Sequence, residues 1–198
     1  MTLFVTRHGE TTLNQQRKFY GALDVPIDEQ GRQQASQLAA KLRGQPLDVI
    51  IRSDTRRTQQ TAQPIIEDHP NAEVLVNPGL NEKGFGDWEG LDADEIEAKD
   101  PVTWHDWIAN PFDVTPITPN GAESFADFSN RVLTTVATLM PMFNQTANML
   151  LVAHLGTLRV MHQAWVPGTV FWNLDFKAGH YSTYQIQGGK GLLQALNR

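Results

Sequence analysis

The chain has 198 residues, 40% of them hydrophobic and 19% charged, and its formal net charge at pH 7 is −6. This length and composition predict one globular α/β domain over residues 1–198. The acidic balance disfavours nucleic acid and anionic membrane surfaces as partners, and the absence of cysteine excludes disulfides, zinc–thiolate sites and thiol catalysis. Without a signal-peptide pattern, or an apolar run near the roughly 20 residues of a membrane span, a cytoplasmic protein is expected.

The first predicted strand, residues 3–6, stops abruptly at Arg7, His8 and Gly9. A buried strand that ends in polar residues is typical of a strand whose carboxyl end opens into a binding site. Gly9 lets the backbone approach a ligand closely. Residues 10–12 then suit the first turn of a helix, whose free N–H groups attract anions. A cation, an imidazole and a helix start at one place predict a phosphate site.

A helix is predicted over about residues 28–43. Asp28 suits its N-cap, Gly44 suits its end, and apolar residues recur between them at helical spacing. A second buried strand, 47–51, follows this helix and also runs directly into polar residues. The first half of the chain therefore repeats one pattern, a buried strand that ends in side chains able to bind a ligand.

Arginines at the start of the next helix strengthen the case for a bound anion. Ser53 or Asp54 can cap this helix, and Arg56 and Arg57 lie in its first turns. That end of a helix is electrostatically unfavourable for cations, so their presence indicates an anion nearby. For Arg56 a solvated helix face is the favoured interpretation. Pro64 is expected to kink or stop the helix.

The second half of the chain continues the alternation of strands and helices. Its predicted elements are a strand over 74–76, short helices within 92–108, an amphipathic helix over 122–144, a strand over 149–153, a helix over 157–165 and an edge hairpin over 181–196. The strand over 149–153 is the most apolar, and it runs directly into His154. A glycine-rich loop after the strand over 74–76 carries Glu82.

Alternating strands and helices predict a mostly parallel sheet covered by helices on both faces, that is, a three-layer α/β/α sandwich with an antiparallel edge. In such sheets ligands bind beyond the carboxyl ends of the strands. His8, Ser53, Arg57 and His154 all fall at or just beyond predicted strand ends. The spacing therefore predicts that these four side chains meet.

Motifs spread over nearly the whole chain resemble, in the same order, those of the histidine phosphatase superfamily, which includes the cofactor-dependent phosphoglycerate mutases. The matching residues are 7–11 with Asn14; Gly21, Asp24, Pro26 and Gly31; Ser53, Asp54, Arg57 and 60–62; Leu80, Glu82, Gly86 and 88–90; 121–124; and His154 with Gly156. The resemblance implies a phosphoglycerate mutase-like fold and chemistry that needs no metal and no other cofactor.

The resemblance also implies catalytic roles for five residues. His8 would be the nucleophile and would take up the phosphoryl group as a phosphohistidine. Arg7, Arg57 and a protonated His154 would hold the phosphoryl oxygens and neutralise their charge. Glu82 would give a proton to the leaving oxygen and then take one from the water that hydrolyses the phosphoenzyme.

Six further residues are predicted to contact the substrate: Asn14, Gly9, Thr11, Gly21, Leu155 and His180. Asn14 would add a hydrogen bond to the phosphate, and His180 lies near the place where family members shape the pocket. Leu155 departs from the pattern, because the family usually has a glycine there. Lys18 and Tyr20 replace the usual arginine and glutamine before Gly21. These departures bear on the choice of substrate rather than on catalysis.

His154 follows Glu82 by 72 residues, and this segment is shorter than the corresponding insertion of phosphoglycerate mutases. A mutase must keep water away from its phosphorylated intermediate, so the short segment favours hydrolysis. We therefore predict a metal-independent phosphomonoesterase that acts through a phosphohistidine on a small phosphorylated metabolite.

Residues 81–89, together with Gly179 and Ser182, resemble the pattern of bacterial α-ribazole-5′-phosphate phosphatases, which makes α-ribazole 5′-phosphate one candidate substrate. Two alternatives stay open: a phosphoglycerate mutase, and a catalytically silent regulatory or binding module on the same fold. The expected partner is a small phosphorylated substrate, without nucleic acid or membrane, and a homodimer stays open.

Overall fold

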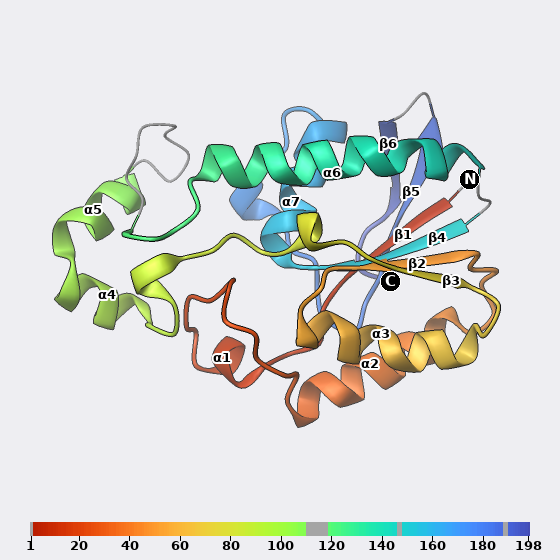
Figure 1. The fold of residues 1–198 in the computed structure, drawn as a ribbon, viewed down its shortest axis with the longest axis horizontal. Helices are drawn as coiled ribbons and strands as arrows, with labels where there is room; N and C mark the ends of the chain where they lie inside the picture. The colour runs from red at the N-terminus through yellow and green to blue at the C-terminus, as the bar shows by residue number, and fades with distance from the viewer. Residues whose placement is uncertain (1, 110–118, 146–147, 188–189) are drawn as a thin grey trace.

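The computed structural model describes residues 2–109, 119–145, 148–187 and 190–198. Its centre is a six-stranded sheet in the order β3-β2-β4-β1-β5-β6 (Figure 1). The strands are β1 (Thr2–Arg7), β2 (Val49–Arg52), β3 (Glu73–Val76), β4 (Asn148–Ala153), β5 (Ser182–Gln187) and β6 (Lys190–Ala195). Strands β3, β2, β4 and β1 are parallel, whereas β5 is antiparallel to β1 and to β6. The predicted mostly parallel sheet with an antiparallel edge is confirmed.

Helices cover both faces of this sheet. The α-helices are α1 (Thr12–Gln15), α2 (Glu29–Leu42), α3 (Arg56–Asp68), α4 (Ala93–Lys99), α5 (Pro101–Ala109), α6 (Phe125–Gln145) and α7 (Leu155–Trp165), and the 3-10 helices are η1 (Pro78–Leu80), η2 (Gly86–Trp88) and η3 (Phe171–Asn173). Helices α2 and α3 lie on one face of the sheet, and α6 and α7 lie on the other (Figure 1). Among the described helices, none combines the length and the apolar character needed to cross a membrane.

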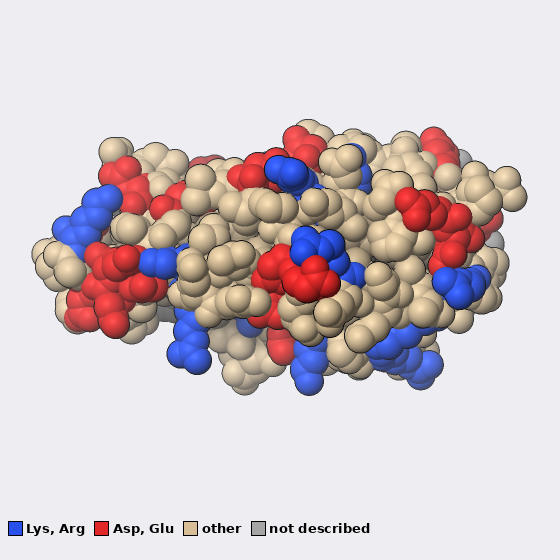
Figure 2. Space-filling model, turned by 90° about the horizontal axis from the view of Figure 1, so that it is seen from below, with Lys and Arg blue, Asp and Glu red and all other residues tan. Residues whose placement is uncertain are grey.

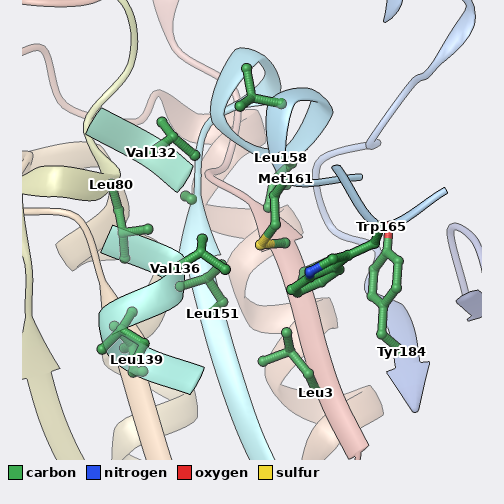
Figure 3. Packing of buried hydrophobic residues seen from close by; sticks show 14 of the residues in the cluster. Leu3, Leu80, Val132, Val136, Leu139, Leu151, Leu158, Met161, Trp165 and Tyr184 are labelled. Carbon is green, nitrogen blue, oxygen red and sulfur yellow. The ribbon is translucent and has the colours of Figure 1, made fainter. Parts of the chain in front are cut away.

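Side chains that alternate along the strands supply two separate hydrophobic cores. On one face, Phe4 of β1 packs in a cluster with Leu38 of α2. On the other face, Leu3 packs in a cluster with Val132 of α6 and Trp165 of α7 (Figure 3). This alternation follows from the strand geometry, in which successive side chains point to opposite faces. The three layers are thus held together through the sheet.

The register of the parallel strands determines where the site forms. Arg7 at the end of β1 lies opposite Ala153 at the end of β4, and β2 pairs with the other side of β4. His8, Ser53 and His154 follow these three strands directly. They therefore emerge at the same edge of the sheet, as the spacing of the sequence predicts.

A third apolar cluster lies at one end of the molecule, beside α4 and α5 (Figure 1, left). Trp88, Ile96 and Trp104 are its buried members, and Phe19 and Trp107 pack against them. The rings of Trp104 and Trp107 stack with their centroids 5.5 Å apart. This cluster anchors α5, whose Trp107 reaches the site described below.

The boundaries of α3 differ from the prediction. Its N-cap is Thr55 rather than Ser53 or Asp54, and Pro64 lies inside the helix, which continues for about another turn. A proline removes one backbone donor from the helical ladder. Ile65, next to it, is fully buried against the sheet, and this tertiary packing outweighs the loss of one hydrogen bond. Of the two effects predicted for Pro64, a kink or a stop, the stop was wrong, because the helix continues to Asp68.

Three other elements differ in extent. The short helix α1 runs from Thr12 to Gln15, beyond the first turn that the sequence predicts over residues 10–12. Helix α6 begins at Phe125, three residues later than predicted. Helix α7 begins at Leu155 with His154 as its N-cap, two residues earlier than predicted. The last difference matters for the site, because it puts the start of a helix directly beside the second histidine.

Gly31 of α2 packs against the turn that follows His8. A Cβ at Gly31 would lie 2.2 Å from the Glu10 carbonyl oxygen and 2.8 Å from Ile27 Cβ. We expect Gly31→Ala to lower the free energy of unfolding by about 1–3 kcal/mol, as other overpacked sites do, measured by urea denaturation. Gly44→Ala is the control, because its Cβ would meet nothing within 4 Å. Equal stability of both variants would contradict the close contact between α2 and this turn.

Candidate active site

His8 is held rigidly at the end of β1 and is 4% exposed. Its backbone N–H donates to the Ala153 carbonyl oxygen at 3.0 Å, which extends the pairing of β1 with β4 by one residue. Its ring Nδ1 lies 2.7 Å from the Gly9 carbonyl oxygen. Because a carbonyl oxygen only accepts, the hydrogen-bond network assigns the ring proton to Nδ1 and leaves the lone pair on Nε2. The fold therefore presents a nucleophilic nitrogen.

His154 lies beside His8, with the two ring centroids 5.2 Å apart. The Arg57 Nε–H donates to His154 Nδ1 at 3.3 Å. With Nδ1 accepting, Nε2 carries the ring proton and donates it to Ser53 Oγ at 2.8 Å. The structure thus brings His8, Ser53, Arg57 and His154 together, from three different strand ends.

Arg57 is a fully buried cation. Its guanidinium donates to the Leu23 carbonyl oxygen at 2.9 Å and to the Gly21 carbonyl oxygen at 2.8 Å, and it lies 5.0 Å from the centre of the Tyr20 ring. Burial lowers the pKa of Arg57, yet an arginine remains charged in proteins. Gly21 therefore acts through its carbonyl oxygen, which fixes this cation in place.

The two histidines are neutral at pH 7 in the protein alone. Burial lowers the pKa of His8 well below 6.5, and the charges of Arg7 and then Arg57 lower it further. For His154 the pKa is also lowered well below 6.5 by burial first, and next by the charge of Arg57. A phosphate dianion between these groups would supply the opposite charge and raise the pKa of His154.

Glu82 is fixed by the start of α7. Its Oε2 accepts from the Gly156 N–H at 2.8 Å, and its Oε1 accepts from the Lys83 N–H at 3.0 Å. A Cβ at Gly156 would lie 2.4 Å from Oε1, so this approach requires glycine. The positive end of the helix dipole also favours a carboxylate here. Glu82 and His8 line the same pocket.

That pocket has a volume of about 320 Å³. Much of its wall is aromatic: Phe19, Tyr20, Phe85, Trp107, Phe125, Phe128, Phe171 and Trp172. Its cationic side chains are Arg7, Arg17, Lys18, Arg57, Lys83 and Arg159, and Glu82 is the single carboxylate among the described residues that line it. The charge suits an anionic group, and the aromatic wall suits an apolar remainder of the same molecule.

Two of the six predicted substrate-contacting residues, Asn14 and Leu155, line this pocket. Asn14 Oδ1 accepts from the Tyr20 hydroxyl at 2.8 Å. Tyr20 is buried, so this departure from the family pattern supports both Asn14 and Arg57. Lys18 also lines the pocket, and its ammonium forms ion pairs with carboxylates at the start of α4.

The other four, Gly9, Thr11, Gly21 and His180, are not among the described residues that line the pocket. The Gly9 N–H donates to Thr61 Oγ1 at 2.8 Å, and Thr11 is the N-cap of α1. The His180 Nδ1 lies 3.1 Å from the Ala178 carbonyl oxygen. These residues contribute to the scaffold around the site in the described structure.

Several lining residues lack any sequence signal of the kind that marks the histidines. Arg159 follows Leu155 by four residues on α7, so helical spacing places it on the same face as that lining residue. Its Nε–H donates to the Leu174 carbonyl oxygen at 2.7 Å. Phe85 and Trp172 come from separate loops that meet only in the tertiary structure.

Glu82 also lines a second cavity, of about 550 Å³, and is the single described residue that the two cavities share. Asn81, Glu123 and Arg131 are among the residues that line this second cavity. Within the described part of the chain, no group of three His, Asp or Glu side chains is arranged as the ligands of a metal ion would be.

The model of the histidine phosphatase superfamily (branch 1) matches residues 3–198, and the chain belongs to this superfamily. The adenosylcobalamin/alpha-ribazole phosphatase of Salmonella typhimurium is 30% identical over 199 residues, which cover 100% of this chain and 96% of that protein. The crystal structure of the alpha-ribazole phosphatase from Shigella flexneri superposes with a TM-score of 0.90 and 27% identity, and covers 100% of this chain and 96% of that one.

The phosphoglycerate mutase of Schizosaccharomyces pombe is 33% identical over 164 residues, which cover 80% of this chain and 76% of that protein. The phosphatases therefore match the full length, whereas this mutase matches a shorter part. The family, the phosphoglycerate mutase-like fold and the assignment as a phosphatase are confirmed, and the mutase alternative is less well supported.

The lowered pKa values of His8 and His154 make stability depend on pH. An unfolded histidine titrates near 6.5, above both folded-state values, so the unfolded chain binds more protons as the pH falls below about 6.5. We expect the free energy of unfolding to be constant between about pH 6.5 and 8. Below this range it should fall by up to about 1.4 kcal/mol per pH unit for each histidine.

Urea denaturation at several pH values measures this slope. His154→Asn should reduce it, whereas His105→Asn should not, because His105 is exposed and pairs with Glu97 at the surface. A slope between pH 5 and 6.5 that is the same in both variants would contradict the burial of a neutral His154.

Proposed function

We propose that this chain is a metal-independent phosphomonoesterase that transfers the phosphoryl group of a small phosphorylated metabolite to His8 and then to water. The observation that carries the proposal is the pocket shared by His8 and Glu82, in which the His8 Nε2 lone pair faces a cluster of fixed cations and a single described carboxylate. This arrangement supports nucleophilic attack on a bound phosphate better than it supports a silent binding module.

In the first step, His8 Nε2 attacks phosphorus, the P–N bond forms, and the bond to the ester oxygen breaks. Arg57 and Arg7 hold the phosphoryl oxygens. Arg7 Nε is buried without a hydrogen-bond partner in the described part of the chain, and a phosphoryl oxygen would satisfy it. His154 takes up a proton from solvent beside the dianion, and Glu82, which must carry a proton for this step, gives it to the leaving oxygen.

In the second step, the Glu82 carboxylate takes a proton from a water molecule, whose oxygen attacks phosphorus as the P–N bond breaks. Orthophosphate leaves, His154 returns its proton to solvent, and His8 and Glu82 return to the states in which they entered the first step. The charge that a magnesium ion neutralises in kinases is here neutralised by Arg7, Arg57 and His154. No step in this sequence requires a metal ion.

The leaving group is an alcohol with a bulky apolar or aromatic part. The aromatic wall of the pocket supports this choice, since it offers planar faces rather than cations alone. The names of the two α-ribazole phosphatases support α-ribazole 5′-phosphate as one candidate. A small carboxylate-bearing ester such as phosphoserine would leave much of this wall without contact.

We further propose a cytoplasmic protein, with one catalytic domain over residues 1–198 and no nucleic-acid partner. Acidic and basic side chains are interspersed on the face shown in Figure 2, without a continuous basic area for a phosphate backbone. A homodimer remains open, and analytical ultracentrifugation would determine whether it forms.

Wild-type protein should hydrolyse p-nitrophenyl phosphate in the presence of EDTA, and His8→Ala should reduce this rate by at least about 1,000-fold, because the covalent route is lost. Rapid acid-free quenching with ³²P-labelled substrate should trap acid-labile, base-stable phosphate on His8. Turnover by the wild type that does not exceed the His8→Ala background would favour the silent module.

Incubation with 3-phosphoglycerate and its bisphosphate primer separates hydrolysis from the mutase alternative. Release of phosphate without isomerisation is expected. Fast isomerisation with little released phosphate would overturn the hydrolase assignment, although it would still be consistent with a phosphohistidine intermediate.

Trp107→Ala tests the leaving-group wall. We expect kcat/KM for benzyl phosphate to fall by about tenfold, because an aromatic contact of ~1.5 kcal/mol is lost, while kcat/KM for ethyl phosphate changes by less than about twofold. Val102→Ala on the same helix is the control, because Val102 is 72% exposed. Equal losses on both esters would show that Trp107 supports the fold of the site rather than the leaving group.

A further inference from the structure

Arg131 of α6 forms hydrogen bonds with the backbone segment that carries Glu82. Its Nη1 donates to the Gly79 carbonyl oxygen at 3.1 Å and to the Asn81 carbonyl oxygen at 3.0 Å. Its Nη2 donates to the carbonyl oxygen of Glu82 itself at 3.4 Å. One guanidinium therefore contacts three carbonyl groups within four consecutive residues, and the last of these belongs to the residue proposed as the acid.

Glu123, just before the start of α6, orients this guanidinium. Its Oε1 accepts from Arg131 Nε at 2.8 Å, and its Oε2 accepts from Arg131 Nη2 at 2.7 Å. This bidentate geometry is the most directional ion pair available to arginine. The backbone N–H of Glu123 also donates to the Gly84 carbonyl oxygen at 3.0 Å. The pair thus contacts the chain on both sides of Glu82.

Glu82 also borders an open hollow at the surface of the molecule. The cavity of about 550 Å³ is lined by Glu82, Glu123 and Arg131, and Glu82 also lines the catalytic pocket. Leu80, at the start of this segment, is buried in the main core, and the Thr157 hydroxyl lies 3.3 Å and 3.1 Å from the Leu80 and Asn81 carbonyl oxygens. These contacts hold the start of the segment, whereas Arg131 holds the carbonyl group of Glu82 itself.

Helix α6 does not need Arg131 to fold against the sheet. Phe128 and Val132, close to Arg131 on the helix, are buried in the main core, whereas the Arg131 and Glu123 side chains remain 28% and 22% exposed. Glu123 lies in the segment 121–124 that matches the family pattern, and the mechanism above gives that segment no role.

We propose that the Arg131–Glu123 ion pair positions Glu82 for proton transfer to the leaving oxygen. This inference rests on the proposed acid role of Glu82. Arg131 touches neither the substrate nor the reacting atoms, so it is a positioning residue. Because a displacement of about 1 Å can cost about 100-fold in rate, loosening this pair should impair proton donation and leave attack by His8 unchanged.

The test compares two esters in wild type, Arg131→Met, Glu82→Gln and the double variant. Benzyl phosphate needs a proton on its leaving oxygen, whereas p-nitrophenyl phosphate hardly does. We expect Arg131→Met to reduce kcat/KM for benzyl phosphate by about 10- to 100-fold and for p-nitrophenyl phosphate by less than about threefold. In the Glu82→Gln background, Arg131→Met should reduce kcat/KM for benzyl phosphate by less than about a further threefold, because the acid that Arg131 positions is already absent.

Two further variants separate positioning from general stability. Glu123→Gln keeps the shape of the partner and weakens only the ion pair, so it should show the same selective loss to a smaller extent. Arg43→Gln breaks an ordinary surface ion pair with Asp68 and should leave the ratio of the two activities unchanged. Thermal denaturation of each variant checks that it is folded under the assay conditions, so that the activities of folded proteins are compared.

Equal losses on both esters in Arg131→Met and Glu123→Gln, or no loss in either variant, would overturn the proposed positioning role while Glu82→Gln stays selective. Full additivity of Arg131→Met and Glu82→Gln would overturn it as well. If Glu82→Gln itself loses both activities equally, the acid role in the proposed function fails, and the inference about Arg131 fails with it.

Discussion

A buried positive charge without a carboxylate partner is the constraint on which the rest of this site depends. Arg57 is fully buried, and none of the ion pairs among the described residues includes Arg57 or Arg7. Burying a charge is costly unless hydrogen bonds compensate it, and the carbonyl oxygens of Gly21 and Leu23 provide that compensation. Carbonyl groups hold the cation without neutralising it, so its field remains directed at the pocket.

In the proposed mechanism, this field lets His8 and His154 take different roles. Burial and the arginine charges lower the pKa of both, which keeps His8 unprotonated at Nε2 and therefore nucleophilic. His154 accepts from Arg57 at Nδ1 and donates to Ser53 at Nε2. To take a proton beside a bound anion, His154 would give up the hydrogen bond that its Nδ1 accepts from Arg57. Only the neighbouring hydrogen bonds distinguish the proposed nucleophile, His8, from the proposed electrostatic partner, His154.

The sequence predicts the part of the site around His8 and His154 well, because each signal is local. A buried strand that ends in a polar residue can be recognised over a few residues, and parallel pairing then brings the ends of β1, β2 and β4 together. A stop of α3 at Pro64, one of the two effects predicted for this proline, does not occur, because the local rule ignores the burial of Ile65. The aromatic wall was not predicted as a unit, because Phe85, Trp107 and Trp172 come from segments whose proximity is a tertiary property.

The two halves of the pocket also differ in how they are held in place. His8 owes its position to the strand ladder and to one carbonyl group, and both are part of the most buried region of the molecule. Glu82 lies on a loop, and its carboxylate is held by the Gly156 and Lys83 amides. Hydrogen bonds of this kind do not require a dry environment, so the carboxylate can keep its place while water reaches it. A hydrolase needs this property at its acid and base, whereas a mutase must exclude water there.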